Sequence, residues 1–244
     1  MIEVKNLHKR FGAVTAVDDV SFAAADGVVT GLLGPNGAGK TTTLRMLTTL
    51  IEPDRGAALI DGQDVARDPI EARRRIGVLP DTRGLYPRLT AREHIQYAGE
   101  LHGLRPEGLR QRIEELIELL DMRAIADRRA EGFSNGERVK VALARALVHG
   151  PRNVMLDEPT NGLDVMSTRA VRALIRRLRD QGKCVLFSSH VMQEVSAVCD
   201  RIVVVARGRV VAEGTPEEIR RRAGKENLEE AFVAVIGSDQ GLAQ

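Results

Sequence analysis

The sequence predicts an α/β fold, in which a mainly parallel sheet carries a small N-terminal antiparallel β subdomain and an inserted α-helical subdomain. Three observations support this prediction. Short apolar runs alternate with helical patterns, as expected when parallel strands are joined by crossover helices. One buried strand leads directly into a glycine-rich turn and then into a helix. The stretch from Pro87 to about His149 is almost wholly helical, which indicates an insertion into the α/β core.

Length and composition limit the class of protein. The chain has 244 residues, of which 43% are hydrophobic. This length suits one large α/β domain, and this much apolar material excludes an intrinsically disordered chain. Basic and acidic residues nearly cancel, 36 against 34, and only 3% of the residues are aromatic. Composition therefore gives no electrostatic or base-stacking reason to expect nucleic acid as a partner.

Two further features bear on where the protein works. Cys184 and Cys199 are isolated and lack the spacing of a metal site, so we expect buried, reduced thiols as in cytosolic proteins. The first residues do not resemble a signal peptide, and no apolar run approaches the ~20 residues needed to cross a bilayer. Any membrane role is therefore expected to depend on another chain.

The strands and the first helix can be placed in order along the chain. Residues 2–7 and 16–22 are expected to form the small antiparallel sheet. Residues 28–33 form the buried strand before the glycine-rich turn, and a helix is expected from Lys40 to about Ile51. The remaining strands of the core are expected at residues 57–61, 76–79, 153–157, 184–188 and 202–205.

The helical insertion and the C-terminal region have clear helix signals. Thr90 and Glu93 fit a capping box, in which each side chain satisfies an exposed backbone amide. Thr215 is expected to begin a further helix, with Pro at its first position and Glu at its third. We expect the tail beyond Gly237 to lack regular structure. Within the insertion, one apolar helix face is formed by Ile113, Leu116, Ile117 and Leu120.

The glycine-rich turn carries the strongest chemical signal. Residues 34–41 match the pattern G-x-x-x-x-G-K-[ST] between a strand and a helix. Glycines let the backbone wrap closely, so that its amide groups and the helix start face phosphate oxygens. Lys40 is expected to hold the β- and γ-phosphates of ATP, and the Thr41 hydroxyl is expected to ligate Mg²⁺. The expected nucleotide-binding residues here are Gly34, Pro35, Asn36, Gly37, Ala38, Gly39, Lys40, Thr41 and Thr42.

A second signal is the pair of carboxylates that ends the strand at residues 153–157. Asp157 can help to hold Mg²⁺, and Glu158 lies one step further, where a base can polarise the water that attacks the γ-phosphate. Alone, such a pair is usually only a helix start or a solvated turn. Together with the phosphate-binding loop, the pair is better explained as part of an ATP-hydrolysing site.

The remaining motifs resemble those of one family. Residues 133–137, Phe-Ser-Asn-Gly-Glu, resemble the LSGGQ signature of ABC ATPases. Asp164 lies in a segment similar to the D-loop, His190 resembles the switch histidine, and Phe11 stands where the family stacks an aromatic ring on adenine. The resemblance implies a P-loop ABC ATPase core from residues 1–82 and 150–214, a helical subdomain with the signature at 83–149, and a helical tail at 215–244.

The resemblance also implies a mechanism. Two cassettes, most simply a homodimer, would close head to tail on two ATP molecules. Ser134 and Gly136 of one copy would meet the γ-phosphate held by Lys40 of the other, because a helix start offers amide groups to an anion. His190 would contact the γ-phosphate and orient the water near Glu158. Hydrolysis would drive separate integral membrane permease subunits, with the cassette bound peripherally at the cytoplasmic face of the cell membrane.

The motifs depart from the family pattern at three positions. Asn135 stands where Gly is usual, and Glu137 stands where Gln is usual. Both remain among the expected nucleotide contacts, and either replacement can slow closure. The glutamine that the family uses near Mg²⁺ aligns with Asp81. A carboxylate suits Mg²⁺, so Asp81 is an expected ligand, although Asp adds charge and has a shorter reach.

Several stretches suggest which kind of ABC protein this is. The segment between the phosphate loop and the signature is too short for the coiled coil of ABC-like DNA-repair ATPases, and one cassette argues against the two-cassette translation factors. Residues 81–86, 136–147 and 161–168 resemble Nat-type sodium exporters of the ABC-2 type, whereas residues 227–232 resemble the helix of drug and polysaccharide exporters. Sodium export is the expectation. Export of a drug, lipid or polysaccharide, or a regulatory or translation role, stays open.

Overall fold

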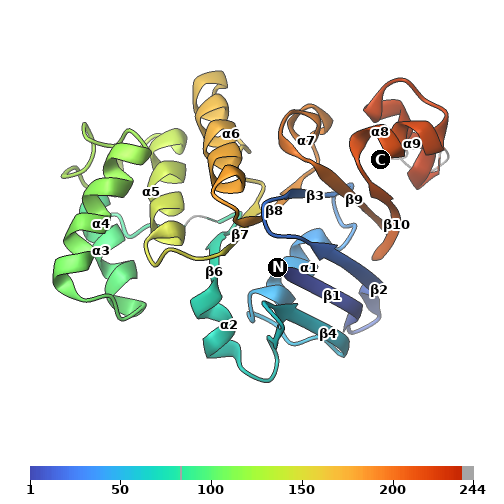
Figure 1. Cartoon of the computed structure of the whole chain (residues 1–244), viewed down its shortest axis with the longest axis horizontal. Helices are drawn as coiled ribbons and strands as arrows, with labels where there is room; N and C mark the ends of the chain where they lie inside the picture. The colour runs from blue at the N-terminus through green and yellow to red at the C-terminus, as the bar shows by residue number, and fades with distance from the viewer. Residues whose placement is uncertain (83, 238–244) are drawn as a thin grey trace.

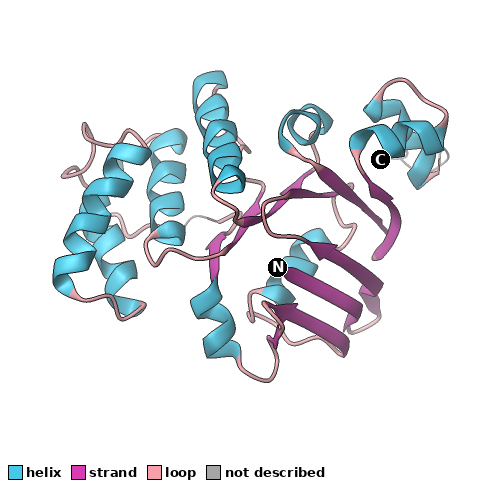
Figure 2. Ribbon diagram, viewed as in Figure 1, coloured by secondary structure: helices cyan, strands magenta, loops and turns pink. Residues whose placement is uncertain are grey.

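The structure is a computed structural model that describes residues 1–82 and 84–237. These residues form two sheets and a set of helices (Figures 1 and 2). The smaller sheet is N-terminal and has the strand order β2-β1-β4-β5. Its long strands, β1 (Ile2–Phe11) and β2 (Val14–Ala24), pair antiparallel as predicted.

One predicted strand belongs to a different sheet. The strand expected at residues 57–61 is β4 (Arg55–Ile60), and its predicted place in the parallel core is wrong. It pairs antiparallel with β1, and the short β5 (Gln63–Asp64) pairs with its other edge. Ile2 and Ile60 are opposite each other and both are fully buried. A short apolar run shows that a strand is buried but not which strand it pairs with.

The larger sheet has the order β10-β9-β3-β8-β7-β6. All neighbours in it are parallel except β10 (Arg209–Gly214), which pairs antiparallel with β9 at one edge. β10 was not predicted from the sequence, because this edge strand is only partly buried and lacks the apolar run of the others. The parallel strands are β3 (Val29–Leu33), β6 (Ile76–Leu79), β7 (Asn153–Asp157), β8 (Cys184–Ser189) and β9 (Arg201–Ala206).

Side chains alternate between the two faces of the larger sheet and supply two separate cores. In β7, Val154 and Leu156 belong to one core and Met155 to the other. Helices α6 and α7 cover the first face, whereas α1 and the N-terminal sheet lie on the opposite side (Figure 1). These helices are α1 (Lys40–Leu47), α6 (Val165–Asp180) and α7 (Met192–Val198). The first helix is shorter than predicted and is followed by Thr49 with a φ of 61°.

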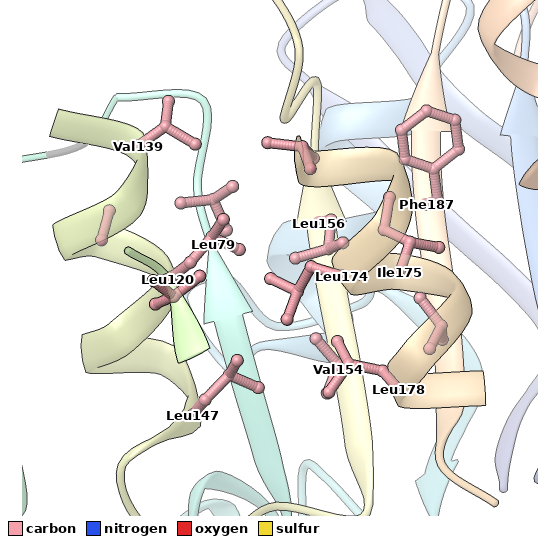
Figure 3. Packing of buried hydrophobic residues seen from close by; sticks show 14 of the residues in the cluster. Leu79, Leu120, Val139, Leu147, Val154, Leu156, Leu174, Ile175, Leu178 and Phe187 are labelled. Atoms are coloured by element: carbon pink, nitrogen blue, oxygen red, sulfur yellow. The ribbon is translucent and has the colours of Figure 1, made fainter. Parts of the chain in front are cut away.

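The predicted helical stretch contains α3 (Ala91–Leu101), α4 (Pro106–Leu119), the 3-10 turn η1 (Ala130–Gly132) and α5 (Asn135–Leu147). The capping box of Thr90 and Glu93 is confirmed, as is the burial of the apolar face on α4. These helices share a core with the sheet. Figure 3 shows Leu79, Leu147, Val154 and Leu174 pointing into this shared region between α5, β6, β7 and α6.

The remaining helices are α2 (Pro69–Arg75), α8 (Pro216–Ala223) and α9 (Leu228–Ile236). The helix start predicted at Thr215 is confirmed with a complete capping box. Cys184 and Cys199 are buried free thiols, as expected. The prediction for the tail concerns residues 238–244, which lie outside the described part of the chain. Among the described helices, none combines the length and the apolar character that a bilayer span requires.

Candidate active site

The candidate active site lies where the parallel strands β3, β7 and β8 end. Leu33 is in register with Ser189, and Asp157 is in register with Ser188. The loops that follow these residues therefore leave the sheet at the same edge, which is where parallel α/β sheets bind their ligands. They carry the phosphate-binding loop, the carboxylate pair and His190.

Two glycines of the phosphate-binding loop allow close backbone packing. A Cβ atom on Gly34 would lie 2.2 Å from the carbonyl oxygen of Val205, and one on Gly39 would lie 2.5 Å from that of Ala16. Gly39 also has a φ of 103° and immediately precedes α1. Both positions exclude a side chain, so the loop can curve tightly and present the start of α1 to a phosphate group.

Lys40 is buried at the start of α1, with an exposed fraction of 6%. Its ammonium donates hydrogen bonds to the carbonyl oxygens of Gly34 at 2.7 Å and Pro35 at 3.1 Å. Burial lowers the pKa of Lys40, while the charges of Glu158 and Asp157 act in the opposite direction. The loop thus holds a cation beside both carboxylates, in the place where a polyphosphate would be bound.

Ser188 holds the two carboxylate residues that follow each other at the end of β7. Its hydroxyl donates to Oδ1 of Asp157 at 2.5 Å and accepts from the backbone amide of Glu158 at 3.1 Å. Glu158 has a left-handed backbone with a φ of 47°. This conformation is uncommon for a residue with a side chain, and such residues are concentrated at functional sites. Ser188 was not predicted from the sequence as a site residue.

The predicted pair of Glu158 and His190 is in contact. Nδ1 of His190 lies 3.0 Å from both carboxylate oxygens of Glu158. The Glu158 side chain is largely buried, whereas His190 is 42% exposed. An exposed histidine on a buried carboxylate can reach a ligand that enters from solvent while it still orients the carboxylate.

The three residues predicted to hold Mg²⁺ line one small pocket. This pocket has a volume of about 140 Å³, and its walls include Thr41, Asp81 and Asp157. A hydroxyl and two carboxylates are oxygen ligands of the kind that Mg²⁺ prefers. Within residues 1–82 and 84–237, no cluster of three or more His, Cys, Asp or Glu side chains is suited to a metal ion. Mg²⁺ usually takes further ligands from water and from substrate phosphates, so the residues fit a nucleotide-bound ion.

Phe11 lies at the end of β1 with half of its surface exposed. It pairs with Val14 across the hairpin, and two residues further on the carbonyl of Ala16 packs against Gly39. Nζ of Lys9 lies 5.6 Å from the centre of the Phe11 ring. The hairpin therefore connects an exposed aromatic ring to the phosphate-binding loop, as a ring that stacks on a nucleotide base requires.

The signature segment forms the start of α5. The Ser134 hydroxyl accepts from the amide of Glu137 at 3.2 Å, and the amide of Ser134 donates to Glu137 Oε2 at 2.7 Å. The backbone hydrogen bond from Ser134 is the main cause that lowers the pKa of Glu137, and Arg128 also contacts this carboxylate at 3.0 Å. Glu at this position therefore has a local role as a helix cap, which Gln can also perform.

The signature segment also packs against the start of α6. Asn135 donates a hydrogen bond to the carbonyl of Gly162 at 3.5 Å. A Cβ on Gly136 would lie 2.6 Å from the hydroxyl of Ser167. Asp164 caps α6 by accepting from the amides of Met166 and Ser167 at 2.9 Å each, and the hydrogen bonds from Ser167 lower its pKa.

The structure therefore assembles the predicted residues in two groups. Lys40, Asp157, Glu158 and His190 are brought together at one edge of the sheet, whereas the Ser134 segment lies with Asp164. Helices α1 and α5 lie on opposite sides of β7 (Figure 1). Within one copy of the chain, the residues around Lys40 and the signature segment therefore belong to two separate groups.

Comparison with known proteins identifies the family. Residues 17–161 match the sequence profile of the family described as "ABC transporter". The chain belongs to this family. It is 44% identical to the ABC transporter ATP-binding protein NatA of Bacillus subtilis, over 97% of this chain and 98% of that protein. It is also 38% identical to the lipopolysaccharide export system ATP-binding protein LptB of Haemophilus influenzae, over 90% of this chain and 92% of LptB.

A solved structure supports the same assignment. It is the dimeric, post-hydrolysis state of an ATP-binding cassette bound to ADP and Pi. This cassette is 27% identical to the chain and superposes with a TM-score of 0.80, over 88% of this chain and 98% of that structure. The chain is thus an ATP-binding, ATP-hydrolysing subunit of an ABC transporter, a class that pairs as dimers and works with membrane permease subunits.

Proposed function

We propose that two copies of this ABC ATPase close head to tail and hydrolyse ATP at two composite sites. The observation that carries the proposal is the division of the site residues within one copy. The phosphate loop, Glu158 and His190 share one edge of the sheet, whereas the signature segment forms the start of α5 in the helical insertion (Figure 1). A second copy can supply the missing signature to each nucleotide, because its helix start offers amide groups to the γ-phosphate.

The proposed roles within one half-site follow from chemistry and position. Lys40 and the loop amides hold the phosphates, and the exposed ring of Phe11 stacks on adenine. Glu158 accepts a proton from the attacking water, and His190 orients Glu158 until the γ-phosphate offers it a second partner. Mg²⁺, when bound through Thr41, Asp81 and Asp157, would neutralise charge on the transferring phosphoryl group.

We propose that this dimer is peripheral at the cytoplasmic face of the membrane and drives separate permease subunits. The docking region would be the groove between α3, α5 and the sheet, next to the segment that follows Asp81. This groove has a volume of about 310 Å³, and Tyr97 and Leu101 on its wall are 42% and 71% exposed. Exposed apolar residues around a groove suit the apolar face of a helix from a partner.

Sodium is the proposed cargo. This part of the proposal rests on the three stretches that resemble Nat-type exporters, since no residue of the cassette would touch the transported ion. The alternative cargo is a drug, a lipid or a polysaccharide, and the similarity to LptB together with the C-terminal helix α9 favours it. A regulatory or translation-associated ABC ATPase without a membrane partner would instead be found with ribosomes in cell fractions.

The test is ATP-dependent uptake of radioactive sodium into inverted membrane vesicles that contain this chain and its membrane partner. Wild-type vesicles are expected to accumulate sodium, and vesicles with Glu158→Gln are expected to show none. Intact ATP hydrolysis without sodium uptake would rule out sodium as the cargo and leave the drug, lipid and polysaccharide alternatives. Equal uptake by the Glu158→Gln vesicles would contradict the role of Glu158.

A further inference from the structure

The buried carboxylate of Glu194, near the candidate site, has no role in the proposed steps of ATP hydrolysis. Glu194 lies in the first turn of α7, and only 8% of its surface is exposed. Its Oε2 accepts a very short hydrogen bond from the Thr160 hydroxyl and a longer one, at 3.4 Å, from the Ser189 hydroxyl. Within the described residues, no cation forms an ion pair with it. Burying a carboxylate costs desolvation free energy, so a buried carboxylate beside the catalytic loops is expected to have a structural or functional role.

The two partners of Glu194 lie next to the two proposed catalytic residues, Thr160 in the loop after β7 and Ser189 at the end of β8. Thr160 follows Glu158 by two positions, and Ser189 immediately precedes His190. The Ser189 hydroxyl accepts from the amide of Val191 at 3.0 Å, so its own proton is available for Glu194. One carboxylate oxygen therefore joins the loop after β7 to the end of β8.

On the β7 side, this junction lies beyond the last residue that pairs in the sheet, whereas on the β8 side it is formed by the last strand residue, Ser189. The strand pairing ends at Asp157 and Ser188, and Glu158 then leaves the sheet with its left-handed backbone. The Ser188 hydroxyl supports Glu158 from the strand side. Beyond Asp157 and Ser188, the His190–Glu158 pair and the hydrogen bonds of Glu194 link the segment after β7 to the end of β8. The hydrogen bond from Thr160 to Glu194 thus holds the Glu158 loop two residues after Glu158.

We propose that Glu194 is a positioning residue that sets the spacing between Glu158 and His190 by holding Thr160 and Ser189 on one carboxylate oxygen. The proposal rests on the roles proposed above for Glu158 and His190. Glu194 touches neither water nor nucleotide in this role. It acts through the loops, because a base displaced by about 1 Å from its productive position can lose on the order of 100-fold in rate.

The chain offers closely matched variants. Thr160→Val removes the donor hydroxyl without changing the shape of the side chain, and Thr160→Ser restores the hydroxyl. The control is Thr30→Val, because Thr30 is a buried threonine of β3 whose hydroxyl has no hydrogen-bond partner within the described structure. On the carboxylate side, Glu194→Gln keeps an oxygen that accepts both hydroxyls, whereas Glu194→Ala removes it.

The measurement is kcat and KM for ATP with the purified full chain, together with the melting temperature of each variant. Thr160→Val and Glu194→Ala are expected to lower kcat by ~10-fold or more, with KM within ~2-fold of the wild type, because the phosphate loop is untouched. Thr160→Ser and Glu194→Gln are expected to recover most of kcat. Thr30→Val is expected to match the wild type.

Two outcomes would overturn the inference. One is a folded Thr160→Val protein with wild-type kcat. The other is a loss of kcat in Thr160→Val that is not specific to this hydroxyl. This would be seen if Thr160→Ser did not restore kcat, or if Thr30→Val lost as much. Glu158→Gln, measured alongside, separates this inference from the proposed function. If Glu158→Gln is inactive and Thr160→Val is normal, only the positioning role of Glu194 fails. If Glu158→Gln hydrolyses ATP normally, the proposed role of Glu158 fails as well.

Discussion

At the scale of single residues, Glu158 is held from two directions. Its backbone amide donates to Ser188, and its carboxylate faces Nδ1 of His190. Its backbone lies in the left-handed region, which costs free energy for a residue with a side chain. The left-handed backbone of Glu158 therefore lowers the free energy of unfolding, while its two contacts keep the carboxylate in one orientation. This is the behaviour expected of a group that must meet a water molecule in a defined position.

Gly39→Ala tests the tight backbone of the phosphate-binding loop. The new methyl group would meet the carbonyl of Ala16 in addition to the strain of a φ of 103°. We expect the free energy of unfolding to fall by ~2 kcal/mol or more and the binding of ATP to be lost. Urea denaturation and titration with a fluorescent ATP analogue measure both effects.

The matched control for Gly39 is Gly103→Ala. Gly103 also has a left-handed backbone, with a φ of 75°, but nothing lies within 4 Å of its added Cβ. It is expected to cost only ~1 kcal/mol and to leave ATP binding unchanged. Equal effects of the two substitutions would show that strain alone, and not the close approach of Ala16, limits Gly39.

Ser188→Ala tests the support beneath the carboxylate pair. The substitution leaves the buried Asp157 carboxylate and the Glu158 amide without their shared partner. We expect a loss of about 1–3 kcal/mol in the free energy of unfolding and a fall in kcat of ~10-fold. Denaturation and steady-state ATPase assays give the two values. Ser167→Ala, which removes a hydroxyl bonded to the exposed Asp164, should cost less than ~1 kcal/mol.

At the scale of elements, the unusual Glu in the signature is explained by the start of α5. Ser134 and Glu137 form a complete capping box there, and Arg128 adds an ion pair. A helix start at this place keeps the amide groups of the signature in order, whichever of Glu or Gln closes the box. The departure from the family pattern thus conserves the local structure.

Glu137→Gln is therefore expected to be almost neutral. It should change the free energy of unfolding by less than ~0.5 kcal/mol, whereas Glu137→Ala should cost ~1 kcal/mol. Thermal and urea denaturation of both variants provide the measurement. Glu93→Ala in the matching capping box of α3 is the control and should cost about as much as Glu137→Ala. A Glu137→Gln protein as unstable as Glu137→Ala would refute the capping explanation.

A histidine with a lowered pKa lies just after the end of α5. His149 follows this helix, stacks on His102 with ring centres 3.7 Å apart, and contacts the carbonyl of Ile76 at 3.0 Å. Burial lowers the pKa of His149 from 6.5 to about 4, and the charges of Lys183 and Arg112 act in the same direction. The folded protein therefore favours the neutral ring.

The pKa of His149 gives a prediction with a defined sign. The stabilisation is complete above about pH 6.5, the pKa of the unfolded state, and is lost as the pH falls towards about 4. Because the ring is partly exposed, we expect a contribution of about 1–2 kcal/mol. Urea denaturation of the wild type and His149→Gln across this range should show a shallower pH dependence for the variant. Parallel curves would contradict the prediction.

The elements also show what the sequence could and could not reveal. The phosphate loop and the capping boxes at Thr90 and Thr215 were predictable, because each depends on residues close together in the chain. The sheet to which β4 belongs was not predictable, because partner choice depends on distant strands. The roles of Ser188 and Glu194 were not predictable for the same reason. Their roles come from contacts with residues 30 or more positions away.

At the scale of the whole molecule, the larger sheet separates two cores. The core of the N-terminal sheet and α1 supports the phosphate loop, and the core shared by α3 to α6 supports the signature. Figure 3 shows how α5 and α6 contribute side chains to the same apolar region over β6 and β7. Packing on the two faces of the sheet thus supports different parts of the proposed site, which two copies of the chain would complete.

The most direct test of this account is the mass in solution of Glu158→Gln with Mg²⁺ and ATP, measured by light scattering. The variant is expected to bind ATP without hydrolysing it and to form a dimer of roughly twice 26.7 kDa. The double variant with Ser134→Arg should bind ATP and remain a monomer, since the arginine would block the phosphate-facing helix start. A monomer of Glu158→Gln with ATP bound, or a dimer that survives Ser134→Arg, would contradict the composite site.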